Sequence, residues 1–226
     1  YWYEVSFSKI GFSFSSRIEA LNSRKKWFTY NKGGAYRKWY GNNEIVINWE
    51  GDGEEISTQK EYDLKTGKIT PNNSKCWNKD FYFKENVTWS ALSSGGISLR
   101  YSASGSIFDT KGQCIFTDTV DDLYFYMAIL NSNAAIEFMS ILAPTLDFNA
   151  GSIAKVPISK DHNYLEIVEN SKKLVCQSKL IWDLSELSVN FKVNKMFALR
   201  DEDGKCVSSF KEYVKESEKC TGFLKS

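Results

Sequence analysis

The sequence predicts a mixed α+β protein, in which a twisted, mostly antiparallel sheet is packed by helices and is followed by a long helix and a helical C-terminal tail. Short apolar runs separated by glycine-, asparagine- and serine-rich turns fill the first two thirds of the chain. After Asp118 the apolar residues change to helical spacing. With 226 residues, of which 42% are apolar and 15% aromatic, the chain can bury a substantial core.

The first strand is expected directly after the turn-forming sequence Gly41–Asn42–Asn43. From Glu44 to Glu50, large apolar side chains alternate with smaller or polar ones, which is typical of a strand with one buried face. Further short strands are expected where apolar and β-branched residues recur between turns. These strands are Phe81 to Phe83, Val87 to Leu92, Ile97 to Tyr101 and Gln113 to Thr117.

Two helices are expected to cover this sheet. The first carries apolar side chains at helical spacing and can be capped by Asp118 or Asp121. The second runs from Asn133 to Leu142, where the following Pro144 stops it.

The last part of the chain is predicted to be mainly helical. From Leu146 to Ile158 the chain is expected to return in extended form, before a long helix from about Asp161 to Trp182. The lysine- and glutamate-rich tail is predicted to be helical from Val207 to about Lys219. We therefore expect an α/β region over residues 1–158 and a helical segment over residues 159–226.

The total charge does not point to a nucleic-acid binder, because the formal net charge is only +1. The charges are nevertheless segregated along the chain. Between Leu21 and Asn43 there are six basic residues, six aromatic residues and no carboxylate, and an acidic run from Glu50 to Glu55 follows. A local basic patch is therefore expected.

The cysteines and the histidine favour neither a metal site nor a disulfide framework. The five cysteines are widely spaced without a C-x-x-C pair, and His162 is the single histidine. Reduced thiols and a cytoplasmic location are expected. No apolar run approaches the length of a membrane span and no signal-peptide pattern opens the chain, so no membrane partner is expected. Because the chain does not begin with methionine, we interpret it as part of a larger protein.

No catalytic set assembles in the sequence. Nucleophile, phosphate-loop and dinucleotide motifs are missing from it, and the lone His162 is more typical of a surface residue than of a catalyst. The chain by itself is therefore not expected to be an enzyme, to bind a metal or to hold a cofactor.

The segment from Leu21 to Asn43, called here the basic aromatic segment, combines groups that suit nucleic acid. Lysine and arginine can neutralise phosphates, and aromatic rings can stack on bases. Gly33 and Gly34 would let a phosphate approach the backbone closely. The alternative is that the rings only pack in the core or in the loop while the lysines are solvated, and composition leaves both open.

A second candidate is the stretch from Trp89 to Tyr101, in which Ser93, Ser94, Gly95 and Gly96 form an expected hairpin tip. Its hydroxyl and backbone donors could contact a groove of the duplex, with Arg100 and Tyr101 on the returning strand. An ordinary hairpin turn would have the same pattern.

Several of these motifs, taken in order, resemble the PglX proteins, which are adenine-specific DNA methyltransferases of type 1 bacteriophage exclusion (BREX) systems. The resemblance begins with YNKGGAYRKWYGN and INWEGDGEEI. It continues through the hairpin that ends in Arg100–Tyr101, and covers nearly the whole chain. It is carried further by Phe108–Asp109, Gly112, Leu130–Asn131–Ser132, Pro144 to Phe148, Gly151, Ile153, Pro157–Ile158, Ser178–Lys179 and Trp182–Asp183.

The sequence also departs from the family pattern. The family hairpin usually carries lysines where this chain has Ala91 and Gly96, so the electrostatic grip on DNA is expected to be weaker or the target different. A second tryptophan-aspartate pair appears here as Val189–Asn190. The S-adenosylmethionine-binding and catalytic motifs of such enzymes do not occur in these residues, and are expected upstream of Tyr1.

The resemblance implies a target recognition domain that binds duplex DNA for an adenine methyltransferase. Its expected partners are DNA, the parent's catalytic domain, which would hold S-adenosylmethionine, and other phage-defence proteins. Lysines and Arg37 are assigned to phosphates, and the hairpin with Arg100 and Tyr101 to the grooves. The DNA-contacting residues expected are Lys25, Lys26, Tyr30, Lys32, Gly33, Gly34, Arg37, Lys38, Trp39, Tyr40, Trp89, Ser93, Ser94, Arg100 and Tyr101.

Two other functions remain open at this point. In one, the aromatic cluster docks the chain onto the catalytic domain or another defence protein. In the other, it forms a carbohydrate-binding platform, against which the carboxylate-free composition of the basic aromatic segment counts. The parent could also carry a nuclease domain.

Overall fold

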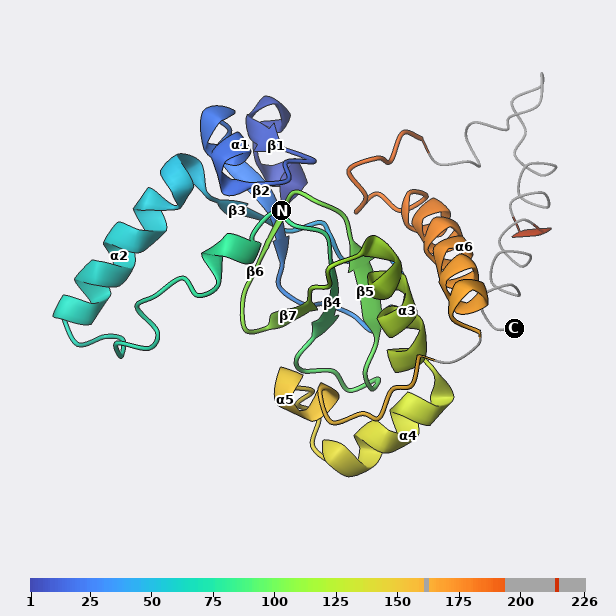
Figure 1. The fold of residues 1–226 in the computed structure, drawn as a ribbon. Coiled ribbons are helices and arrows are strands. Elements are labelled where there is room, and N and C mark those ends of the chain that lie inside the picture. The colour runs from blue at the N-terminus through green and yellow to red at the C-terminus, as the bar shows by residue number, and fades with distance from the viewer. Residues whose placement is uncertain (161–162, 194–213, 216–226) are drawn as a thin grey trace, which may run out of the picture.

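The computed structural model describes residues 1–160, 163–193 and 214–215, and it has the predicted α+β class. Two small sheets lie next to each other, and helices cover the outer side of the second sheet (Figure 1). The strands of the two sheets together are β1 (Ile10–Gly11), β2 (Trp27–Asn31), β3 (Val46–Asn48), β4 (Asn86–Ser90), β5 (Leu99–Ser102), β6 (Ser106–Phe108) and β7 (Gly112–Ile115).

Helices and short 3₁₀ turns connect these strands. The helices are α1 (Arg17–Asn22), α2 (Glu54–Lys65), α3 (Val120–Leu130), α4 (Asn133–Leu142), α5 (Ala150–Ile153) and α6 (Tyr164–Trp182). The 3₁₀ turns are η1 (Trp2–Glu4), η2 (Phe7–Lys9), η3 (Glu50–Asp52) and η4 (Lys79–Phe81).

The first sheet is built around β2, which runs through the basic aromatic segment. It pairs with β3 in antiparallel fashion on one edge, and on the other edge with β1 and then with β6, both parallel. Most strand pairs of the described residues are antiparallel, as predicted, but they form two sheets in place of one, and β2 has parallel neighbours as well. Parallel neighbours arise here because β1 and β6 reach β2 through long connections, which a strand pattern in the sequence does not reveal.

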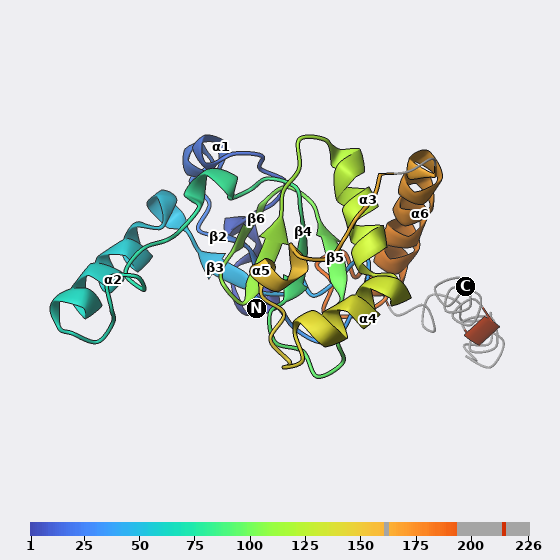
Figure 2. The ribbon, with the colours of Figure 1, turned by 60° about the horizontal axis from the view of Figure 1, so that its bottom comes forward.

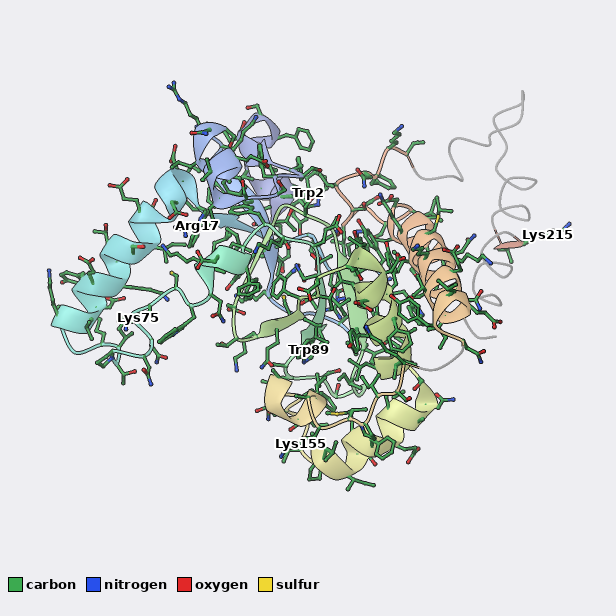
Figure 3. The ribbon with its side chains drawn as sticks, viewed as in Figure 1. Trp2, Arg17, Lys75, Trp89, Lys155 and Lys215 are labelled. Carbon is green, nitrogen blue, oxygen red and sulfur yellow. The ribbon has the colours of Figure 1, made fainter. Side chains whose placement is uncertain are left out.

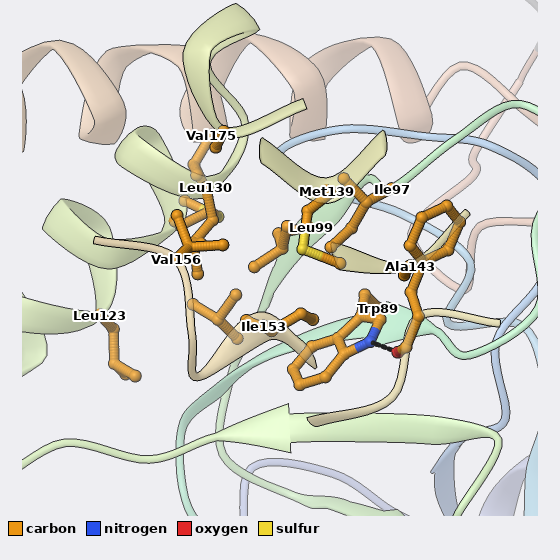
Figure 4. Packing of buried hydrophobic residues seen from close by; sticks show 14 residues of the cluster. Trp89, Ile97, Leu99, Leu123, Leu130, Met139, Ala143, Ile153, Val156 and Val175 are labelled. Atoms are coloured by element: carbon orange, nitrogen blue, oxygen red, sulfur yellow. Dashed lines mark hydrogen bonds between the residues drawn. The ribbon is translucent and has the colours of Figure 1, made fainter. Parts of the chain in front are cut away.

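The second sheet has the order β5–β4–β7 and is antiparallel throughout. All residues of the central strand β4 are buried, and its two faces differ. Val87 and Trp89 point to the helices, where Trp89 donates its indole N–H to the carbonyl of Phe148 at 2.7 Å (Figure 4). Asn86 points toward the first sheet, where its side-chain oxygen lies 3.4 Å from Asn31. A polar layer therefore separates the sheets.

The helical layer consists chiefly of α3, which packs on β4 and β5, and α6, which lies beside α3 in both views (Figures 1 and 2). Val175 of α6 belongs to the same buried cluster as Val87 of β4. The proposed division after residue 158 stays a prediction.

Several predicted elements are confirmed and others need correction. Helix α4 has the predicted limits, and β3, β4, β5 and β7 lie within or close to the predicted strands. The strand predicted from Phe81 to Phe83 is wrong: η4 occupies its start, and Phe83 has a φ of 71°. Tyr82 and Phe83 both enter the aromatic core of the first sheet, so these two neighbours do not alternate as strand residues would.

The helix ends also differ in part from the expectations. The cap of α3 is Thr119, whose hydroxyl accepts from the backbone N–H of Asp122, and not Asp118 or Asp121. The return after Leu146 contains the short helix α5, and α2 was not expected at all. The expected start of the long helix at Asp161 lies outside the described residues, as does His162. The tail helix predicted from Val207 to Lys219 also lies outside them, apart from residues 214 and 215, which are helical.

Among the described residues, no single helix is long and apolar enough to span a membrane, and α3 with α4 passes that test only as a pair bent by 71°. The described part of the chain also contains no group of three or more histidine, cysteine or acidic side chains placed to hold a metal ion.

Candidate nucleic-acid interface

The structure divides the basic aromatic segment between β2 and the loop that follows it. Lys25 and Lys26 precede the five-residue strand β2, whereas Lys32 follows it. At about 3.3 Å per residue, the two groups of lysines are roughly 20 Å apart along the strand. They therefore do not form one compact patch.

The lysines before β2 already have partners. Lys25 donates from Nζ to the carbonyl of Ser8 at 2.6 Å. Lys26 lies 3.6 Å from the carboxylate of Glu50 and 5.8 Å from the ring of Trp27. Both ammonium groups therefore already interact with other parts of the protein near the first sheet.

Arg37 and Lys38 turn toward the helices. Lys38 donates from Nζ to the carbonyl of Asn131 at 2.7 Å, and burial lowers the pKa of its ammonium group. The guanidinium of Arg37 lies 4.8 Å above the ring of Trp182. In this structure, both side chains attach the loop to the helical layer.

The aromatic residues predicted to touch DNA mostly pack inside the protein. The backbone of Trp39 bonds to the edge of β5, since its N–H donates to Leu99 and its carbonyl accepts from Tyr101. Tyr101 stacks on Tyr124 with ring centroids 5.1 Å apart, and Tyr40 lies partly buried against the helical core. The packing alternative therefore accounts for the position of these rings.

Tyr30 lies at the far end of β2 and bonds to Asp109. Its hydroxyl donates to that carboxylate at 2.5 Å, and burial together with this bond raises the pKa of Tyr30. Asp109 also accepts from the backbone N–H groups of Lys111 and Gly112. These three donors fix the position of the carboxylate beside the loop that contains Lys111.

Trp89 and Arg100 lie in the interior. Trp89 is 1% exposed and Figure 3 shows it among densely packed side chains, while Arg100 is 2% exposed. Neither side chain offers surface to a ligand in this conformation. Arg100 is nevertheless close to the surface described next.

Two loops that are far apart in the sequence meet at one place. The loop Lys32–Tyr36 follows β2, and the hairpin tip Ser93–Gly96 connects β4 to β5. Ser90 donates from Oγ to the carbonyl of Gly34 at 3.1 Å, and a Cβ atom placed on Gly95 would lie 3.0 Å from the Tyr36 side chain. We call Lys32–Tyr36 together with Ser93–Gly96 the two-loop surface.

The glycines of this surface have backbone conformations that other residues rarely adopt. The φ angles are 97° for Gly33 and 142° for Gly34. A Cβ atom on Gly34 would also lie 2.9 Å from the side chain of Asn42, which holds the loop by donating to the carbonyl of Ala35 at 2.7 Å. The outer face of Gly34 is therefore backbone alone, and it is exposed.

Lys111, which belongs to none of the predicted DNA-contacting residues, also lies beside this surface. Its carbonyl accepts from Ala91 at 2.9 Å and would be 3.3 Å from a Cβ atom on Gly33. Gly112 packs directly on the backbone of Asn31, where no side chain would fit. No local pattern marks Lys111, because this approach joins two hairpins through a tertiary contact.

The exposed groups of the two-loop surface suit a polyanion. Lys32, Ser94 and Lys111 are exposed, and the Tyr36 side chain is 47% exposed. Ser93 is partly buried, and its backbone N–H donates to Leu146 at 3.2 Å. Two cations beside glycine backbone can accept phosphates, and hydroxyl groups can donate to phosphates or base edges.

A separate cavity of about 400 Å³ lies between the two sheets and the end of α6. Its lining includes Asn31, Ser102 and Ser106, whose side chains bond to one another at 3.0–3.1 Å. These three polar side chains therefore satisfy one another.

Comparison with known proteins identifies two relatives, while no protein-family model matches the chain. It is 40% identical over 220 residues to the adenine-specific methyltransferase PglX of Lacticaseibacillus casei (strain Zhang). It is 34% identical over 221 residues to the adenine-specific methyltransferase BrxX of Escherichia coli O9:H4 (strain HS). Each match covers 96% of this chain, but the chain spans only 18% and 16% of the two relatives.

The resemblance drawn from the motifs is thereby confirmed. Along almost its whole length, the chain is homologous to one segment of adenine-specific methyltransferases. The similarity extends well beyond the basic aromatic segment and the hairpin.

Proposed function

We propose that this chain is the DNA target recognition segment of a larger, PglX-type adenine-specific DNA methyltransferase that acts in phage defence. In this role it binds duplex DNA and positions the target adenine for a catalytic domain elsewhere in the parent protein. The homology to adenine-specific methyltransferases supports the proposal. The structural observation that carries it is the meeting of the Gly33–Gly34 loop and the Ser93–Gly96 hairpin beside Lys32 and Lys111.

The chemistry of base methylation gives a reason for such a segment. An enzyme that modifies an adenine within a duplex must rotate the base out of the stack, while other parts of the protein hold the helix and read its sequence. Phosphate contacts set the register, and contacts to base edges give specificity.

On this proposal the exposed groups of the two-loop surface divide these tasks. Lys32 and Lys111 bind phosphates, and the exposed backbone of Gly34 allows close approach. Ser94 and Tyr36 lie at the tip where base edges can be reached. Lys25 and Lys26 are proposed as outlying phosphate contacts at the other end of β2.

S-adenosylmethionine has no proposed site in this chain. The sequence contains neither of the motifs that bind the cofactor and carry out the transfer in such enzymes. The cofactor is therefore assigned to the parent's catalytic domain, with which this segment would work in the cytoplasm.

A second candidate function is docking onto the catalytic domain or another defence protein. Exposed apolar side chains favour it, because Leu92 and Leu146 flank the Ser93–Gly96 tip and Ile141 lies at the end of the neighbouring helix α4. Docking through this apolar rim would depend weakly on salt, in contrast to phosphate contact.

The proposal is tested by a salt titration of binding to duplex DNA. The double variant Lys32→Ala/Lys111→Ala is expected to show a slope of log K against log[salt] that is shallower by about 2, since about 0.9 counterions are released per phosphate contact. Binding is measured by fluorescence anisotropy, after thermal unfolding has shown that the variant is folded.

The matched control is Lys173→Ala, which removes an exposed lysine from α6. Its slope should equal that of the unaltered chain. An unchanged slope in the double variant, or weak binding without salt dependence, would instead favour docking to protein.

A further inference from the structure

We propose that the exposed backbone of Gly34, next to the buried Gly33, is an anion site that seats one phosphate of the DNA backbone, and that the buried guanidinium of Arg100 supplies the positive charge beneath it. This inference rests on the proposed function and deepens it. It assigns to Arg100 a positioning role from below the surface, in place of direct contact with a groove.

Gly34, Ser90 and Arg100 lie one behind the other from solvent to core. Gly34 is exposed, and its carbonyl accepts from Ser90 Oγ at 3.1 Å. Arg100 in turn donates from Nη2 to Ser90 Oγ at 3.5 Å. The Ser90 hydroxyl therefore lies between the Gly34 carbonyl and the guanidinium, with a hydrogen bond to the carbonyl and a longer contact to the guanidinium.

The N–H donors of the Arg100 guanidinium make only weak hydrogen bonds within the protein. All three of its contacts are long, at 3.5 Å to Ser90 Oγ, 3.4 Å to the carbonyl of Arg37 and 3.5 Å to that of Ser98. These distances exceed those of ordinary N–H···O bonds. Its Nε has no partner among the described residues. The ion pairs of the described part of the chain do not include Arg100.

Burial and the neighbouring charge of Arg37 both disfavour the charged form of Arg100. Together they lower the pKa of Arg100 to about 10, against smaller opposing effects of Glu44 and Cys114. The group still carries its proton at neutral pH. A buried cation without a counter-ion is costly, so an anion bound above it would gain more than it would from a solvated arginine.

A purely structural role explains this arrangement less well. The three acceptors around Arg100 are two carbonyls and a hydroxyl, and a neutral donor could serve them. None of these contacts among the described residues requires a positive charge on Arg100. A phosphate on the glycine backbone would use it.

Phosphate is the anion that the rim of the site favours. Lys32 and Lys111 flank the glycines, and the nearby carboxylate of Asp109 is engaged by three donors. Phosphate oxygens can accept from backbone N–H groups and from lysines at once, as at other glycine-rich anion sites.

The first test compares Arg100→Gln with Arg100→Lys in the DNA salt titration. Removal of the charge is expected to make the slope shallower by about 0.9, which corresponds to a loss of affinity of about 8-fold at 0.1 M salt. Arg100→Lys should retain the slope even if it binds more weakly. A folded Arg100→Gln variant with the slope of the unaltered chain would overturn the inference, while the proposed function would still stand on the Lys32→Ala/Lys111→Ala result.

The second test needs no variant. Inorganic phosphate is titrated into the unaltered chain at constant ionic strength, and backbone and arginine side-chain N–H signals are followed by two-dimensional NMR. Signals of Gly34 and of Arg100 Nε are expected to shift and saturate, while Arg17, which is paired with Asp80 and Asp52, should not move.

The outcome of the NMR titration is decisive even if Arg100→Gln does not fold. Unmoved Gly34 and Arg100 signals would overturn the site. If phosphate does shift the Gly34 and Arg100 signals, duplex DNA is expected to shift the same signals or to reverse the shifts that phosphate caused. Shifts with phosphate but none with DNA would assign the site to a free anion and overturn the proposed seat for the DNA backbone.

Discussion

Lysines of one short segment have different roles, which residue type alone does not distinguish. Lys32 is exposed on the two-loop surface, Lys26 pairs with Glu50, and Lys38 points into the protein. Lys38 donates to the carbonyl of Asn131, a residue whose side-chain amide bonds to both backbone groups of Leu99. Lys38 thus supports the junction between α3 and β5.

We predict that Lys38→Ala lowers stability and leaves the DNA salt slope unchanged, in contrast to Lys32→Ala. The lost bond joins the half-buried ammonium group of Lys38 to the carbonyl of the buried Asn131, so the free energy of unfolding should fall by about 1–2 kcal/mol. Urea denaturation measures the stability and the salt titration measures the slope. A slope that falls as much as in Lys32→Ala would show that Lys38 leaves Asn131 to bind DNA.

At the scale of elements, charged side chains join α1 to the turn before α2. Arg17 donates from Nε to Asp52 at 3.0 Å, and the same carboxylate accepts from the indole N–H of Trp49 at 3.2 Å. Burial opposes ionisation of Asp52, but the bond and charge of Arg17, with Lys79, outweigh it and lower its pKa below the ordinary 3.8. The junction therefore depends on an ionised carboxylate.

This junction predicts a dependence of stability on pH. Because the pKa of Asp52 is lower in the folded chain, the unfolded chain binds more protons, and the contribution is present above pH 4 and lost as pH falls through the folded-state pKa. Arg17→Met should lower the free energy of unfolding by about 1–2 kcal/mol at pH 7, a value that allows for partial exposure. It should also reduce the decline between about pH 5 and pH 3.

Urea denaturation at several pH values tests this prediction, with Arg24→Met as the control for an exposed arginine. Equal acid sensitivity of the unaltered chain and Arg17→Met would exclude Asp52 as the source.

The elements that the sequence predicted are those with strong local signals. Ser132 caps α4 and Pro144 follows it, so local sequence signals indicate both ends of this helix. By contrast, α2 has no buried residue and no apolar stripe that a helical pattern would reveal. The strand predicted from Phe81 does not form, because the neighbours Tyr82 and Phe83 both pack in the same aromatic core.

At the scale of the whole molecule, the helix α2 and the segment that returns from it project from the body as an arm (Figures 1 and 2). Within the arm, Lys60 donates to the carbonyl of Lys75 at 3.0 Å, and Trp77 donates to that of Asn72. Near its base, Ile56 and Cys76 pack against the aromatic core of the first sheet. The rest of the arm contributes little to either core.

We predict that replacing residues 58–74 by a short glycine–serine linker leaves the thermal unfolding midpoint within about 3 °C, since about 1 kcal/mol shifts the midpoint of a chain of this size by 2–4 °C. Ile56→Ala at the base of the arm serves as the contrasting variant, and should lower the midpoint more. Differential scanning calorimetry measures both. A large drop in the linker variant would show that the arm is part of the folded body.

The sequence by itself determined the α+β class, the limits of α4, most strands of the second sheet and the relation to adenine-specific methyltransferases. These features depend on local periodicity, caps and motif order, which the chain carries along its length. Tertiary structure alone decided that Gly34 meets Ser90, that Lys111 joins the same surface and that Arg100 is buried beneath it. The contact between Gly34 and Ser90 joins residues 56 positions apart, and whether a charge faces solvent or core depends on what the fold packs against it.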